Sequence, residues 1–203
     1  DARRPAHVAA DTPEGRTDVV AGVPMPGWLS YAESHLWLDT GDDGVGHVGL
    51  DAFVTQLLGR IERLAFAAVK GTAHPAVVLT VRGAEVALRF PKPLPIVAAN
   101  VRLRASLDRL TADPYGSGWL FETRFPAAAA EPGAPLRSGP EARQWMAAEV
   151  QHVTEWAHQH LHDTGTAADG GRFSAGLLDH LGKDDVARLL ARTFPAHDTR
   201  STP

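Results

Sequence analysis

Histidines near the C-terminal end are the residues whose type and spacing best suit chemistry. On an α-helix with about 100° per residue, His152, Glu155, His158 and His162 fall within an arc of about 120°. The i, i+4 spacing of His158 and His162 can place two imidazoles on one metal ion, with Glu155 one turn earlier as an oxygen ligand. Apolar residues occupy the opposite face of the segment, which predicts that the histidines face water. A solvated polar face is therefore favoured over an adventitious or a functional metal site, and no metal or other cofactor is predicted.

The chain lacks the residues and motifs that several other kinds of catalytic and cofactor chemistry need. Cysteine is absent, which removes disulfides, thiolate metal sites, Cys-ligated iron–sulfur clusters and Cys nucleophiles. No G-x-S-x-G motif occurs, and the glycines between Gly41 and Gly49 lack the phosphate-binding G-x-x-x-x-G-K-[ST] pattern. The net charge of −4 argues against a nucleic-acid partner. We therefore predict no catalytic residue and no enzymatic activity.

Short strand patterns fill the middle of the chain. Asp51 is suited to cap a short helix over residues 52–58 that Gly59 closes, and residues 104–110 form a helical turn. Many short strands at close spacing predict a small barrel or sandwich. The predicted strands, separated by turn residues such as Arg82-Gly83, cover 36–38, 45–49, 61–67, 76–82, 85–90, 96–101 and 119–124.

Changes in composition divide the chain into four parts. They are an extended N-terminal arm (1–28), the strand-rich unit (29–125), a linker rich in Pro, Ala and Gly (126–140) and a C-terminal helical extension (141–203) with helices over 141–162 and 184–194. No run approaches 18 apolar residues, so no membrane span is predicted. No signal peptide is recognisable either, and a cytoplasmic location is expected by default.

Three blocks in the strand-rich unit resemble the glycine cleavage system H protein family. Tyr31–Leu38, with its Tyr and His-x-Trp, is similar to the family's opening strand, and Val45–Phe53 followed by Leu57-Leu58-Gly59 is similar to its second strand and short helix. Asp113–Leu120 matches the family's Asp-Pro-Tyr-Gly-x-Gly-Trp signature. The resemblance covers roughly residues 30–125. It implies an α+β fold: a flattened lipoyl-type β-barrel (barrel-sandwich hybrid), here with appended C-terminal α-helices.

The family's prosthetic group needs a residue that this chain lacks at the matching position. In the family, a lysine at the tip of a β-hairpin is acylated with lipoate, whose swinging dithiolane carries an aminomethyl group between enzymes. Gly83 falls at that position, and the guanidinium of Arg82 stays protonated, so it cannot form the lipoyl amide. The nearest lysines, outside the hairpin, are Lys70 and Lys92. The resemblance therefore implies the architecture without the lipoyl cofactor.

The segment after residue 136 resembles the tail of extended H-like proteins that also lack the lysine. Together these features predict a non-catalytic accessory or scaffold subunit, for example of a redox complex. It would act through protein–protein contacts of its N-terminal arm and C-terminal helices. Two alternatives stay open: a metal- or small-molecule-binding protein that uses the C-terminal histidines, and a regulator of glycine cleavage or lipoate metabolism that competes with the true H protein.

Overall fold

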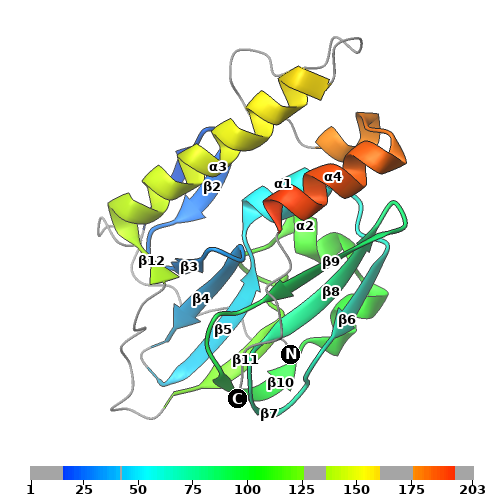
Figure 1. Cartoon of the computed structure of the whole chain (residues 1–203). Coiled ribbons are helices and arrows are strands. Elements are labelled where there is room, and N and C mark those ends of the chain that lie inside the picture. Colours follow the sequence, from blue (N-terminus) through cyan, green and yellow to red (C-terminus); the bar gives the residue numbers. More distant parts are fainter. Residues whose placement is uncertain (1–15, 42, 126–135, 161–175, 195–203) are drawn as a thin grey trace, which may run out of the picture.

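Two antiparallel sheets form the centre of the molecule (Figure 1). The computed structural model describes residues 16–41, 43–125, 136–160 and 176–194, without the side chains of residues 179 and 180. The larger sheet has the order β12 (Leu136–Arg137), β3 (Ser30–Ala32), β4 (Leu36–Thr40), β5 (Val45–Leu50), β11 (Phe121–Arg124), β10 (Leu94–Ala99) and β7 (Gly71–Ala73). The smaller sheet has the order β6 (Arg63–Phe66), β8 (Ala76–Val81) and β9 (Ala84–Arg89).

The two sheets pack against one another through alternating side chains. In β8, Val77, Leu79 and Val81 are buried while the residues between them are half-buried, as the two-residue period of a strand requires. Phe66 of the smaller sheet meets Phe121 of the larger one edge-on, with ring centroids 5.4 Å apart. The predicted unit of many short strands is confirmed, and its strands pair antiparallel throughout the described ranges. Strands β7 and β12 were not predicted, and Val101 lies in a 3-10 helix, η2 (Val101–Ala105), instead of a strand.

Helix α1 (Ala52–Leu58) has the bounds that its flanking residues predict. The Asp51 carboxylate accepts a hydrogen bond from the Val54 N–H at 2.9 Å, which is N-capping geometry. Gly59 has a φ of 60°, and its N–H bonds the Thr55 carbonyl. A second short helix, α2 (Asp108–Ala112), follows η2, so the helical turn predicted over 104–110 is two short helices.

The described part of the predicted N-terminal arm is a β-hairpin that packs on the strand unit. Strand β1 (Thr17–Val20) pairs with β2 (Val23–Pro26). Val23 and Met25 are 0% and 2% exposed. The Tyr31 hydroxyl donates to the Pro26 carbonyl at 3.0 Å, and the Tyr115 hydroxyl donates to that of Pro24 at 2.7 Å. Packing against the strand unit thus orders a segment whose own sequence has no apolar period.

The C-terminal helices are continuous with this core. Helix α3 (Gly139–His160) buries Ala142, Met146, Val150, Val153, Trp156 and Ala157, the face predicted to pack. Trp145 is only half-buried, and residues 161 and 162 of the predicted helix lie outside the described residues. The turn η4 (Leu177–His180) and helix α4 (Lys183–Thr193) lie over α1 and near β9 (Figure 1). One contiguous cluster of buried side chains includes Met25, Met146 and Leu189.

None of the helices in the described ranges is both long and apolar enough to cross a membrane. The polar face of α3, with Glu155 and His158 exposed, illustrates the reason. Charges in α4 follow the helix dipole, with Asp184 and Asp185 in the first turn and Arg192 in the last.

The hairpin's place in the core can be tested by matched substitutions. We expect Met25→Ala to lower the free energy of unfolding by about 2–5 kcal/mol, because removing the buried Met25 side chain leaves a cavity in the core. Val19→Ala in the same hairpin is the control, since Val19 is 69% exposed, and we expect a change within about 0.5 kcal/mol. Denaturant unfolding measures the free energy of unfolding of both variants. Equal effects would contradict the burial of β2 in the core.

Candidate functional site

The β8–β9 hairpin ends in a tight two-residue turn. Val81 and Ala84 form the last strand pair, and Arg82 and Gly83 have φ angles of 50° and 78°. Two successive positive φ values are typical of a type I′ turn, which favours Gly at the second position. A Cβ built on Gly83 would meet nothing within 4 Å, so this position opens outward. The turn predicted at Arg82-Gly83 is confirmed.

Contacts from two sides hold the tip of this hairpin. The Glu62 carboxylate accepts from the Gly83 N–H at 3.3 Å, and Arg82 Nη2 donates to the Leu181 carbonyl at 3.2 Å. Leu181 is buried and lies between η4 and α4. The Gly176 N–H, just before η4, donates to the Gln56 carbonyl of α1 at 3.1 Å. The C-terminal segment thus reaches both the hairpin tip and the helix beside it.

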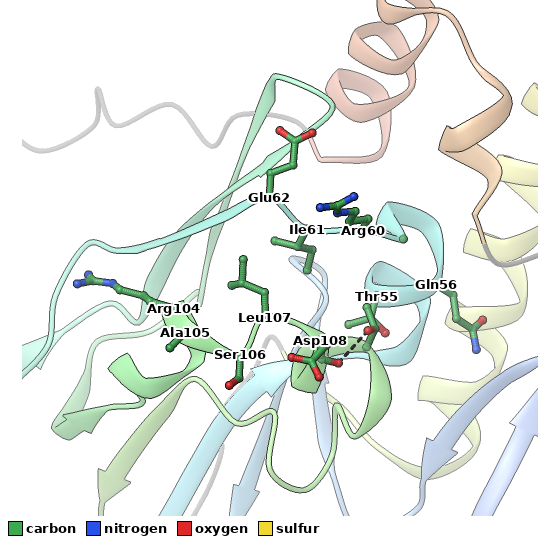
Figure 2. Close-up of a pocket in the computed structure, with 12 residues that line it drawn as sticks. Thr55, Gln56, Arg60, Ile61, Glu62, Arg104, Ala105, Ser106, Leu107 and Asp108 are labelled. Carbon is green, nitrogen blue, oxygen red and sulfur yellow. Dashed lines mark hydrogen bonds between the residues drawn. The ribbon is translucent and has the colours of Figure 1, made fainter.

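A cleft of about 710 Å³ opens next to Glu62 (Figure 2). The Ile61 and Leu107 side chains point toward each other across it, while Arg104 and Gln56 point away. The Thr55 and Thr111 hydroxyls donate to carbonyls of their own helices, at 3.2 and 2.9 Å. No histidine is among the residues that line it. The lining residues are Thr55, Gln56, Gly59, Arg60, Ile61, Glu62, Arg104, Ala105, Ser106, Leu107, Asp108 and Thr111.

The His-x-Trp motif has a structural task. His35 Nδ1 lies 2.8 Å from an Asp51 oxygen, and the side chains are 1% and 0% exposed. The His35 ring stacks on Phe53 at 4.7 Å, with Trp145 of α3 at 4.9 Å and Phe194 beyond α4 at 5.7 Å. His35 therefore joins the strand unit to both C-terminal helices and has no access to a substrate.

The remaining motif residues also act in packing. Trp37 Nε1 donates to the carbonyls of Leu50 and Pro114, at 2.8 and 3.2 Å. Gly49 is required because a Cβ there would collide with the Trp37 indole. The Tyr115 hydroxyl accepts from the Ala52 N–H at 2.9 Å. Burial raises the pKa of Tyr115, as it does that of the buried Tyr31, so both phenols remain protonated donors.

The candidate metal-ligand residues do not form a cluster where they are described. His158 is exposed, as the helical pattern predicts. Glu155 is also exposed, and one of its oxygens accepts from Gln151 at 2.8 Å. His162 lies outside the described residues, so the complete candidate set stays untested. Across the described ranges, no group of three or more His, Cys, Asp or Glu side chains is arranged to hold a metal ion.

Known proteins similar to this chain match its strand-rich unit. A family model described as glycine cleavage H-protein matches residues 29–149. The glycine cleavage system H protein of Marinobacter nauticus is 28% identical over 105 residues, which are 50% of this chain and 80% of that protein. That of Chromobacterium violaceum is 32% identical over 111 residues, which are 53% of this chain and 85% of that protein.

A solved structure supports the same assignment. The crystal structure of a glycine cleavage system H protein from Mycobacterium marinum aligns with a TM-score of 0.50 at 25% identity. The alignment covers 60% of this chain and 98% of that one. The predicted α+β fold, a lipoyl-type β unit with appended C-terminal helices, is confirmed.

A buried histidine in the larger sheet was not singled out by sequence reasoning. His47 pairs in register with Asp39 on one side and Glu122 on the other, and its ring lies 5.3 Å from that of Trp119. Neither ring nitrogen has a hydrogen-bond partner among the described residues. Burial lowers the pKa of His47, although the charges of Glu122 and Asp43 oppose this effect. The sequence signal that could have identified His47 is its position in the strand after the predicted turn, where it pairs with Asp39 across that turn.

The lowered pKa of His47 predicts how stability depends on pH. Because the folded state binds the proton more weakly than the unfolded state, the free energy of unfolding falls as pH drops below about 6.5. The fall continues until the pH reaches the lower pKa of the folded state. We expect His47→Phe to show a smaller loss of melting temperature between about pH 7.5 and pH 5. His152→Gln, at an exposed histidine, is the control and should follow the wild-type curve. Identical curves for wild type and His47→Phe would refute this assignment.

Proposed function

This chain belongs to the glycine cleavage H-protein family, and on that premise we propose that it is a non-lipoylated member. It serves as an accessory or scaffold subunit that acts through protein–protein contacts and catalyses no reaction itself. The observation that carries this proposal is the β8–β9 hairpin tip, where Arg82 and Gly83 occupy the turn and Arg82 binds the Leu181 carbonyl.

Neither residue of the turn offers an acceptor for lipoate. Lipoyl attachment requires an amine that can lose its proton, and a guanidinium does not. Gly83 has no side chain, although the space at its Cβ is open. Lys70 and Lys92 lie at other turns, before β7 and before β10, so a lipoyl group on either would start from a different place.

The C-terminal segment lies beside this tip. The Arg82–Leu181 hydrogen bond and the packing of α4 against β9 bring η4 and α4 to the end of the hairpin. The segment therefore adds surface for contacts with other proteins next to the turn.

The exposed face of α3 is the surface that we propose for such contacts. Ala148, Gln151, Glu155 and His158 are exposed and follow helical spacing on one side of α3. Small and polar residues at the middle of a long helix permit close approach by a partner. A stable complex should bury about 1,200–2,000 Å² in total.

Intact-mass analysis tests the missing cofactor. Wild-type protein incubated with lipoate, ATP and a lipoate ligase should gain no lipoyl mass, since the hairpin has no acceptor amine. Gly83→Lys restores an amine at the position with open space and is expected to be modified. Lys92→Gln is the matched control. A lipoyl adduct on the wild type that disappears in Lys92→Gln would overturn the non-lipoylated assignment.

Paired surface substitutions test the contact role. Ala148→Arg places a bulky charge on the proposed face of α3 and should abolish recovery of a partner in affinity purification from native-level expression. Ala87→Arg makes the same change on an exposed position of β9 and should retain the partner. Both should melt within a few degrees of the wild type, because neither side chain is buried. A monomeric wild type with no stoichiometric partner would contradict the proposal, as would equal recovery with both variants.

A further inference from the structure

A groove of about 350 Å³ lies between α3 and α4. Its size is at the lower end of the range of about 300–1,000 Å³ for small-molecule sites. Trp145, Glu149, His152 and Trp156 line one wall, and their spacing places them along one face of α3. Leu189, Arg192 and Thr193 of α4 line the other. The family match ends at residue 149, so this second wall belongs to the chain's C-terminal segment.

Two opposite charges stand on opposite walls of this groove without pairing. Neither Glu149 nor Arg192 forms an ion pair in the described part of the chain, whereas Arg137, Arg143 and Arg188 each pair with a carboxylate. A gap between two such charges suits a ligand that carries both signs.

The lining of the groove between Glu149 and Arg192 is apolar. Trp156 is 7% exposed, and Val153 and Leu189 are 3% and 0% exposed. One ring face of Trp156 is taken by His160 at 4.2 Å, and Trp145 lies between His35 at 4.9 Å and the Arg137 guanidinium at 5.6 Å. The indoles are therefore held in place by their neighbours, which keeps the apolar surface of the groove preformed.

We propose that this groove binds a free α-amino acid with an aliphatic side chain. The ammonium group binds the Glu149 carboxylate, the carboxylate binds the Arg192 guanidinium, and the side chain packs on Trp156 and Leu189. A simple cation would face Arg192, and a simple anion would face Glu149, whereas a zwitterion satisfies both walls. Glu33, which also lines the groove, is paired with Arg137. This small-molecule site is independent of the proposed contact function and lies off the exposed face of α3 assigned to partners.

Calorimetric titration of the full chain with L-leucine and three analogues tests the assignment. 4-Methylpentanoate lacks the ammonium group, 3-methylbutylamine lacks the carboxylate, and glycine lacks the side chain. We expect L-leucine to bind and each analogue to bind about tenfold or more weakly, since each loses one of the three contacts. Absence of L-leucine binding at millimolar concentration would overturn the proposal. Equal binding of L-leucine and 4-methylpentanoate would do so too, because it would indicate an unspecific apolar site.

Charge-neutralising variants assign the two ends of the ligand. Glu149→Gln and Arg192→Gln should each weaken L-leucine binding about fivefold or more. Glu149→Gln should leave the affinity for 4-methylpentanoate unchanged, and Arg192→Gln should leave that for 3-methylbutylamine unchanged. His158→Gln, on the same helix outside the groove, is the control, and thermal melting checks that all variants are folded. Undiminished L-leucine binding in both neutralised variants would refute the site.

Discussion

The buried carboxylate of Asp51 organises the centre of this molecule. One of its oxygens accepts the Val54 N–H and starts α1, and the other lies 2.8 Å from His35 Nδ1. A fully buried carboxylate is costly unless hydrogen bonds satisfy it, so both contacts are needed. Because the His35 ring in turn touches Trp145 and Phe194, the same interaction sets where α3 and α4 lie on the strand unit.

Because of this arrangement, the C-terminal helices α3 and α4 are part of the same core as the strand unit. Met146 and Leu189 are fully buried in the same cluster as the strand residues, and Arg82 of the hairpin bonds the backbone beside α4. The helices therefore stabilise the fold with one face and leave the other available. The proposed partner contact uses that outer face, and the proposed ligand site is the groove between the two helices.

The end of the β8–β9 hairpin connects the family fold to the chain's particular role. Arg82 and Gly83 form a type I′ turn, in which Glu62 and Leu181 accept hydrogen bonds from groups on both residues. The C-terminal segment thus contacts one side of the hairpin tip, while the space at the Cβ of Gly83 stays open. The proposed accessory role and the proposed amino-acid groove both depend on this segment, through its outer face and its inner face respectively.

Features that depend on a few neighbouring residues were determined by the sequence itself. The cap at Asp51, the end of α1 at Gly59, the turn at Arg82-Gly83 and the packed face of α3 all follow from local backbone and side-chain preferences. Tertiary structure alone decided the β1–β2 hairpin, whose order comes from distant partners such as Tyr115. Tertiary structure also decided that His47 is buried and that Glu149 and Arg192 line the same groove. Both features depend on how segments remote in the sequence pack together, which no local pattern encodes.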